Sequence, residues 1–329
     1  MAIKNLVKGI LTFVPGMLRL RRISQGPTVS SRYCYSVWLR HLVHAAGNGL
    51  SGMPGRIAEL GPGSSLGTGL AGLLCGAQSY VGLDVVDMLD VPLNLRLLDE
   101  LVDLFRRHQQ IPDDREFPRL RPRLKSYDFP AGILPGERLD PALADERVEC
   151  IRQCLTRWGG HEQGGIRIRY VAPWNDPAVV ENASVDFLMS HAVLMYIEDL
   201  PGTFRAFAQW LDPGGFMSHL IDIDFTAGGS VEDWNGHWAC SDFAWRLIKG
   251  NRPYFVNRQP HSEYLRLAME CGFRIVGDVR VEEVPAVPRS RLAKRFRQLS
   301  EEDLHTRGAL IQAVRATPLA DAESREARA

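Results

Sequence analysis

The segment Arg56–Asp84, RIAELGPGSSLGTGLAGLLCGAQSYVGLD, predicts an apolar strand, a glycine turn, a helix of small residues and a second apolar strand. A helix that starts after such a turn presents backbone N–H groups to a ligand. An acid about 20 residues beyond the turn, at the end of the next strand, suits the two hydroxyls of a ribose. Asp84 occupies that place, so the segment predicts a site for a nucleotide-like cofactor.

The glycine spacing helps to say which cofactor. Gly61 and Gly63 fit a dinucleotide fingerprint, but the next expected glycine falls on Leu66, and Gly67 comes one residue late. Glu59 precedes the turn, and a carboxylate beside a pyrophosphate is electrostatically unfavourable. A cationic sulfonium ligand would instead be attracted to this acid, so the pattern disfavours a dinucleotide.

The Glu-x-Gly-x-Gly pattern at Glu59, Gly61 and Gly63 resembles motif I of the class I S-adenosylmethionine-dependent methyltransferases. The resemblance implies an α/β fold with a doubly wound, Rossmann-like sheet of seven strands. It also implies that the glycine turn passes beside the amino-acid part of S-adenosylmethionine and that Asp84 binds its ribose. The family's usual third glycine falls on Ser65, so the match is partial there.

The second half of the chain carries the family's later motifs in the expected order. SVDFLMSHAVLMYI, residues 184–197, resembles the fourth-strand motif, which would bring Ser190 and His191 near the reactive end of the cofactor. LDPGGFMSHLIDI, residues 211–223, resembles the fifth strand with its Pro-Gly-Gly turn. Trp174 follows the predicted third strand, where the resemblance implies either a cover for the adenine or simple packing.

A hydroxyl acceptor would need a general base, since its own pKa is too high for attack as an alkoxide. His191 is the first candidate, although a histidine there could equally hydrogen-bond the backbone beside the cofactor. His237, in the segment EDWNGHW, is the second, or it belongs to an aromatic-packed turn. His219 and Asp222 should lie on opposite faces of their strand, so they do not form a dyad. We expect no metal site, because no group of histidines and acids has the required spacing.

Composition bounds the remaining possibilities. The chain has 329 residues and a formal net charge of zero, which argues against a general nucleic-acid binder. Its six cysteines include no Cys-x-x-Cys pair and are expected to be free thiols in a reducing compartment. No segment has the length of a transmembrane helix or the pattern of a secretory signal, so we expect a cytoplasmic protein.

Charge is uneven along the chain, since residues 1–58 contain no acid. Within residues 1–22 apolar side chains recur at helical spacing among lysines and arginines, with a break expected at Pro15. Such a helix could lie on the inner face of the membrane as a peripheral contact, or fold over the core or the active site. We therefore divide the chain into a basic helical extension (1–50), a methyltransferase domain (51–316) and a flexible tail (317–329).

About eighty residues, 85–165, separate the second and third predicted strands, where the plain family pattern has one helix. This insertion contains two amphipathic segments around a proline-rich stretch, residues 111–130. It could be a cap over the substrate, a homodimer contact or a packing elaboration that touches no ligand.

The acceptor is the least constrained feature. A looser resemblance, carried by PGGFMSHLID at residues 213–222, links the chain to bacterial methyltransferases of surface-polysaccharide synthesis and implies a small-molecule, glycan or glycolipid acceptor. Two other classes of function stay open. One is a nicotinamide-dependent oxidoreductase, and the other is a binding protein that kept the fold without turnover.

Overall fold

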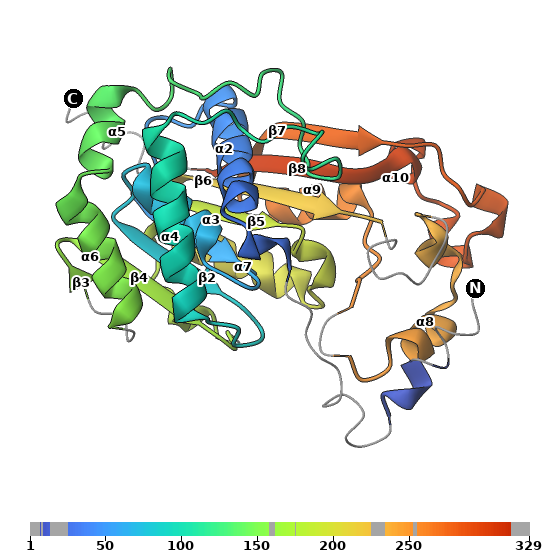
Figure 1. The fold of residues 1–329 in the computed structure, drawn as a ribbon. Coiled ribbons are helices and arrows are strands. Elements are labelled where there is room, and N and C mark those ends of the chain that lie inside the picture. The colour runs from blue at the N-terminus through green and yellow to red at the C-terminus, as the bar shows by residue number, and fades with distance from the viewer. Residues whose placement is uncertain are drawn as a thin grey trace, which may run out of the picture.

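The computed structural model describes residues 7, 9–13, 26–157, 162–174, 176–224, 234–252 and 255–316. These residues form one eight-stranded sheet in the order β3-β4-β2-β1-β5-β6-β8-β7 (Figure 1). The strands are β1 (Arg56–Leu60), β2 (Ser79–Leu83), β3 (Glu162–Gln163), β4 (Ile166–Val171), β5 (Val185–His191), β6 (Leu211–Asp222), β7 (Phe273–Glu282) and β8 (Thr306–Arg315). The pairs from β4 to β6 are parallel, whereas β8 is antiparallel to β6 and β7, and β3 to β4.

This topology confirms the predicted doubly wound α/β sheet, and its antiparallel last strand, β8, pairs with both β6 and β7. The two-residue β3 at the edge adds an eighth strand to the seven predicted. Strand order reverses at β1, which pairs with β2 on one side and with β5 on the other. Ligands of open α/β sheets bind where this reversal leaves a crevice at the carboxyl ends of the strands.

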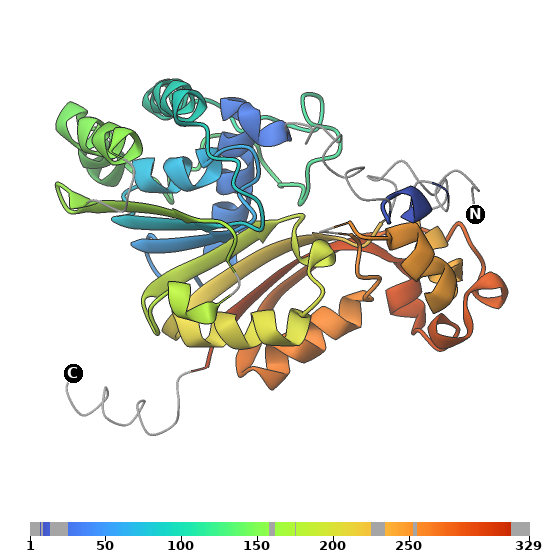
Figure 2. The same ribbon diagram turned by 90° about the horizontal axis from the view of Figure 1, so that it is seen from below.

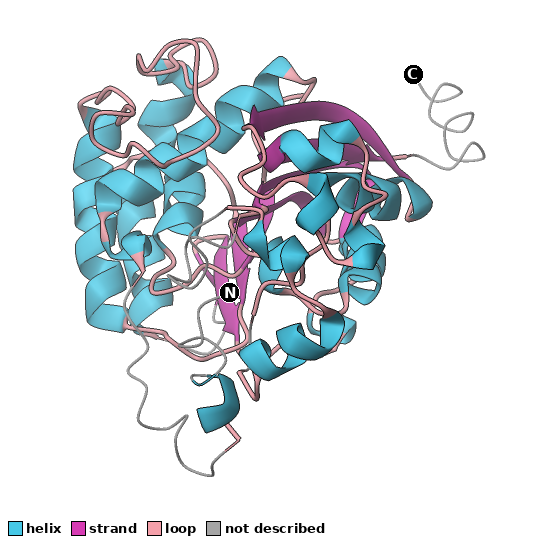
Figure 3. Cartoon of the chain, turned by 90° about the vertical axis from the view of Figure 1, so that its right-hand side faces the viewer, coloured by secondary structure: helices cyan, strands magenta, loops and turns pink. Residues whose placement is uncertain are grey.

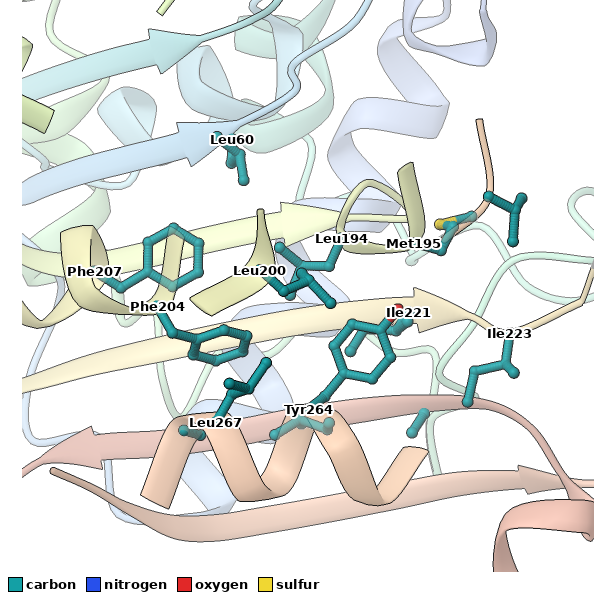
Figure 4. Close-up of a cluster of buried hydrophobic side chains, with 14 of the residues drawn as sticks. Leu60, Leu194, Met195, Leu200, Phe204, Phe207, Ile221, Ile223, Tyr264 and Leu267 are labelled. Atoms are coloured by element: carbon teal, nitrogen blue, oxygen red, sulfur yellow. The ribbon is translucent and has the colours of Figure 1, made fainter. Parts of the chain in front are cut away.

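Helices cover both faces of the sheet, so that the strands form the middle of three layers (Figures 2 and 3). One face carries α2 (Ser31–Gly47), α3 (Gly67–Leu74), α4 (Val91–Arg106), α5 (Gly136–Ala142) and α6 (Asp145–Thr156), and the other carries α7 (Leu200–Trp210) and α9 (His261–Glu270). Each face of the sheet has its own hydrophobic core, the first beneath α2 to α6 and the second beneath α7 and α9. Because side chains alternate between the two faces along β5, Phe187 and Met189 belong to the first core and Leu188 to the second. Figure 4 shows side chains of the second core, among them Phe204, Ile221 and Leu267.

The sequence of residues 237–250, HWACSDFAWRLIKG, predicts one helix, but the segment forms two elements, η6 (Gly236–Ala239) and α8 (Asp242–Lys249). Cys240 has an extended backbone, which interrupts the helical hydrogen bonds. The Ser241 side chain then accepts a hydrogen bond from the backbone N–H of Ala244 at 3.2 Å and starts a new helix. A short helix, α10 (Glu301–His305), precedes β8.

The predicted insertion contains α4, α5 and α6 with an irregular stretch between α4 and α5. α4 starts at an Asp90 cap, whose carboxylate accepts from the Leu93 N–H at 2.9 Å, and it buries Leu98 and Leu101 in the first core. α6 ends at Thr156. The sequence predicts that the second amphipathic segment of the insertion ends at Gly159 and Gly160, and these two residues lie outside the described part of the structure.

The N-terminal region packs into the domain through α2. Trp38 meets Phe187 of β5 edge to face, with ring centroids 5.8 Å apart. Residues 31–47 therefore share the core of the sheet. Of the predicted membrane-contact segment 1–22 the structure describes residues 7 and 9–13 alone, and there Gly9 lies against the backbone of α8 at Ile248. The predicted tail at 317–329 lies outside the described residues.

Candidate functional site

A cavity of about 670 Å³ opens at the carboxyl ends of β1, β2 and β5. Its volume is that of a typical small-molecule site. Of the predicted cofactor residues, the cavity walls contain Glu59, Gly61, Gly63, Asp84, Trp174 and His191. Residues far apart in the sequence thus meet at the crevice that the strand order creates.

The glycine turn between β1 and α3 has a backbone conformation that favours glycine. Gly61 has φ +68°, and its N–H donates to the carbonyl oxygen of Leu83 at 2.7 Å, which joins the ends of β1 and β2. A Cβ at this position would lie 2.6 Å from a methyl group of Val193, so a side chain there would enter the cavity wall. Gly63 has φ +77° and donates to an Asp84 carboxylate oxygen at 3.2 Å. The turn therefore requires glycine for its backbone conformation.

The glycines that allow close packing, Gly67 and Gly69, come one and three residues after the position at which the dinucleotide fingerprint has its third glycine. A Cβ on Gly67 would lie 2.5 Å from the sulfur of Cys34, and one on Gly69 would overlap the ring of Tyr80. Ser65, at the family's third glycine position, instead donates its hydroxyl to the carbonyl of Thr28. Gly67 and Gly69 thus let α3 pack closely against Cys34 and Tyr80, which explains how the partial motif still builds the site.

Glu59 is buried beside the turn with 3% of its surface exposed. It accepts a hydrogen bond from the Tyr80 hydroxyl at 2.7 Å. Burial raises the pKa of Glu59 to about 7, against the opposing effect of hydrogen bonds from Tyr80 and Thr68. A cation held in the cavity would stabilise the ionised form of this carboxyl.

Asp84 directly follows β2 and is held by backbone donors. It accepts from the N–H of Val85 at 2.7 Å and from that of Gly63 at 3.2 Å. Burial raises the pKa of Asp84, and these hydrogen bonds oppose the increase. Because each carboxylate oxygen can accept more than one hydrogen bond, the group can still accept from a ligand's vicinal hydroxyls.

Trp174 is half-buried at the edge of the predicted cofactor site. It lines the cavity, and its backbone N–H donates to the backbone carbonyl oxygen of Asp84 at 3.0 Å. Its ring also packs edge to face on Trp210, with centroids 5.5 Å apart. The contact with Trp210 fixes a flat side chain at the cavity wall.

Ser190 and His191 separate, because neighbouring residues of a strand point to opposite faces. Ser190 is fully buried and hydrogen-bonds Nδ1 of His219 at 2.8 Å, on the face covered by α7. His219 stacks on Phe207 of that helix. The described structure does not place Ser190 in the cavity wall, whereas His191 lines the cavity from the α2 face.

His237 does not reach the cavity. Its side chain is fully buried, and its ring lies 4.9 Å from Trp238 and 6.4 Å from Trp245 between centroids. Burial lowers the pKa of His237 to about 3, with a further decrease from Arg258. This is the aromatic-packed alternative for the segment, and the placement argues against His237 as the base.

The N-terminal segment contributes cavity residues that the sequence did not single out. Gly26 donates to the Ser64 hydroxyl at 2.7 Å, and Ser64 donates its N–H to Thr28 at 3.0 Å, which folds the chain over the glycine turn. Tyr33 and Val37 of α2 complete this wall. No motif marks them, since hydroxyl and apolar side chains of this kind occur throughout the chain.

The proline-rich stretch of the insertion comes close to the same wall. Fully buried Arg40 of α2 donates to the carbonyl oxygens of Pro122 at 2.6 Å and Pro112 at 3.1 Å, which fixes the path of the stretch. Phe117 packs edge to face on Tyr33 with centroids 5.5 Å apart. The stretch therefore supports a side chain that lines the cavity.

His261, Asp278 and Glu302 are the cluster of potential metal-ligating side chains in the described part of the chain. Their ligand atoms lie within 4.8 Å of one another, and His261 Nε2 bonds Asp278 at 2.8 Å. Glu302 pairs with Arg280 instead.

Among the described helices, none combines the length and the apolar character that crossing a bilayer requires.

Comparisons with known proteins give structural neighbours alone. No family model and no curated protein matches the chain. Solved structures that resemble it include the Haloferax volcanii complex of the Trm112 methyltransferase activator with a methyltransferase (14% identity over 88% of this chain and 95% of the other, TM-score 0.42). A second is an S-adenosylmethionine-dependent methyltransferase from Methanosarcina mazei, with 14% identity over 84% of this chain and 98% of the other and a TM-score of 0.39. A third is geranyl diphosphate C-methyltransferase from Streptomyces coelicolor, with 14% identity over 87% of this chain and 76% of the other and a TM-score of 0.42. These resemblances are too distant to transfer an activity, so a function must be argued from the site itself.

Proposed function

We propose that this protein is an S-adenosylmethionine-dependent methyltransferase that acts on a hydroxyl group of a small-molecule or glycan acceptor. The observation that carries the proposal is the meeting of Glu59, the Gly61 turn and Asp84 in one cavity of about 670 Å³. The buried carboxylate of Glu59, directly before the glycine turn, would repel a pyrophosphate, which disfavours a nicotinamide dinucleotide.

The residues present suit S-adenosylmethionine. Asp84 offers carboxylate oxygens to the ribose hydroxyls, Trp174 offers a flat surface to the base, and Glu59 offers negative charge to the cationic end. The bound cofactor supplies a methyl group on a sulfonium leaving group. The protein then mainly has to align the acceptor and exclude water.

The acceptor would approach from the side of His191. This histidine and Tyr33 line the cavity, and their rings meet edge to face with centroids 6.2 Å apart. Burial lowers the pKa of His191 to about 3, with a further decrease from Arg40. His191 is therefore neutral at physiological pH, with one ring nitrogen that carries a proton and one that can accept.

Calorimetric titration with S-adenosylmethionine, S-adenosylhomocysteine and NADH tests the cofactor. The proposal predicts micromolar binding of the first two and no binding of NADH. Binding of NADH alone would support an oxidoreductase instead. Incubation with radiolabelled cofactor and a panel of methyl glycosides then tests turnover, and tight binding with no transfer to any hydroxyl would favour a binding protein without this activity.

A glycolipid acceptor would suit a peripheral contact with the membrane. Val7, Ile10, Leu11 and Phe13 are each 42–52% exposed, in a region that contains no acid. Apolar side chains among basic residues favour an anionic lipid surface. Sedimentation with vesicles containing an anionic lipid tests this: Phe13→Ser should lower the bound fraction, and equal sedimentation with purely zwitterionic vesicles would contradict an electrostatic contribution.

A further inference from the structure

A continuous chain of hydrogen bonds between buried side chains leads from the cavity to the far end of α2. His191 Nδ1 lies 3.1 Å from Nε2 of His41, and His41 Nδ1 lies 2.7 Å from the Ser218 hydroxyl. Gln312 donates to that hydroxyl at 2.8 Å and accepts from the Asn48 amide at 2.7 Å. His41, Ser218 and Gln312 are each 0% exposed, so water does not compete for these bonds.

The donor-to-acceptor direction of this series of hydrogen bonds is fixed by the backbone carbonyl of His41. The Gln312 amide nitrogen also faces the carbonyl oxygen of His41 at 3.3 Å, and a carbonyl can only accept. The Ser218 hydroxyl oxygen therefore accepts a hydrogen bond from the Gln312 amide, and its O–H must donate to another group. Within the described residues its one remaining partner is His41 Nδ1.

This direction determines the tautomer of His191. His41 accepts at Nδ1, so its proton lies on Nε2 and is donated to Nδ1 of His191. Burial and the neighbouring His191 lower the pKa of His41 far below its usual value, which keeps the ring neutral. Neutral His191 then carries its proton on Nε2, the ring nitrogen left for the cavity. In this state it presents a donor and has no lone pair with which to accept a proton.

A different group at the same sheet edge can accept a proton. His191 pairs in register with Leu220, and Asp222 follows two residues later on the same face of β6. At the strand rise and spacing of a sheet, the Cα atoms of His191 and Asp222 lie about 8 Å apart. Within the described structure Asp222 is not among the residues that line the cavity, so only an acceptor that extends past the cavity wall reaches both side chains. The charge of Asp222 also contributes to raising the pKa of Tyr33, a residue of the cavity wall.

The surroundings leave Asp222 available as a base. Among the described residues its carboxylate makes no hydrogen bond or ion pair, whereas the carboxylate of neighbouring Asp224 is bonded to Arg307 at 2.8 Å. Burial raises the pKa of Asp222 to about 6; Asp224 raises it further, and Arg307 and Arg121 oppose the increase. A general base performs best when its pKa lies near the working pH.

We infer that Asp222 takes the proton from the acceptor hydroxyl, while His191, positioned by His41, donates a hydrogen bond from Nε2 to the same oxygen. This inference rests on the proposed function. The acceptor oxygen forms the bond to carbon, the carbon–sulfur bond breaks with its electron pair on sulfur, and the hydroxyl proton passes to the Asp222 carboxylate. The hydrogen bond from His191 occupies one lone pair and leaves the other aimed at the methyl group.

NMR of protein labelled with ¹⁵N-histidine tests the tautomer without any substrate. Neutral His191 is expected to be protonated at Nε2 between pH 6 and pH 8. Gln312→Glu replaces the amide donor with an acceptor, so it should reverse the chain and move the His191 proton to Nδ1. An Nδ1-protonated His191 in the wild-type protein would overturn the inference, because His191 could then act as the base.

Paired variants test Asp222 with the methyl glycoside that turns over best. Asp222→Asn is expected to lower kcat about 100-fold or more, the usual contribution of a general base, and to leave the Kd for S-adenosylhomocysteine within twofold. Asp224→Asn, its ion-paired neighbour, should keep kcat within about threefold and shift the acid limb of the pH profile to lower pH. Equal rates for Asp222→Asn and wild type would overturn the role of Asp222. Absence of cofactor binding in the wild type would instead refute the proposed function, with the tautomer still decided by NMR.

Discussion

Affinity for S-adenosylmethionine should rise with pH because of Glu59. In the ligand-free protein burial raises the pKa of this carboxyl to about 7. Only the ionised form attracts a cation, so binding must drive off the proton wherever Glu59 is protonated. If the pKa of Glu59 in the bound state is about 4 or lower, the pH dependence follows the ionised fraction of Glu59 in the free protein, which rises from about 0.03 at pH 5.5 to about 0.5 at pH 7. The affinity then increases about 16-fold, or about 1.6 kcal/mol.

Calorimetry at pH 5.5, 6, 6.5 and 7 measures this slope, and repeating it in buffers of different ionisation enthalpy counts the protons released. Glu59→Gln is the matched control, since an amide of the same shape does not titrate in this range. The variant should bind more weakly at pH 7 and lose most of the slope. A wild-type affinity that stays flat from pH 5.5 to pH 7, or an equal slope in the variant, would refute the assignment of Glu59 to the cationic end.

Three further outcomes follow from the contacts. Asp84→Ala should weaken cofactor binding by about 1–3 kcal/mol, the cost of lost charged hydrogen bonds, and an unchanged Kd would exclude the ribose assignment. Gly69→Ala should lower the free energy of unfolding by about 1–3 kcal/mol in urea titrations, because its Cβ overlaps the Tyr80 ring, whereas Gly132→Ala, with open space around it, should change little. Arg40→Met removes the donors that hold the carbonyls of Pro112 and Pro122, so limited proteolysis should cut residues 111–130 faster; an unchanged cleavage rate would show that Arg40 does not restrain the stretch.

Much of the fold was predictable because apolar runs and glycine turns are local signals. The strands around Glu59, Ser190 and Met217 were each located to within one or two residues. The break at Cys240 was not predicted, since a helical pattern of apolar residues continues across it and the Ser241 cap is a single hydroxyl. The edge strand β3 is too short to leave a pattern.

The site was predictable where a motif fixes the backbone and unpredictable where tertiary packing brings residues together. Glu59 and Asp84 followed from the glycine turn between them. Nothing in the sequence relates His41 to His191, because 150 residues separate two histidines that meet across α2 and β5. His237 was a wrong choice for the same reason: a histidine between tryptophans is compatible with a ligand loop and with a packed core, and burial decides for the core.

A crystal structure of the protein soaked with S-adenosylhomocysteine tests the central claim most directly. The account predicts the ligand in the cavity at the ends of β1, β2 and β5, with its ribose hydroxyls on Asp84 and its amino-acid end beside Gly61 and Glu59. Density for the ligand elsewhere, or a ribose bound without Asp84, would contradict the proposed cofactor site.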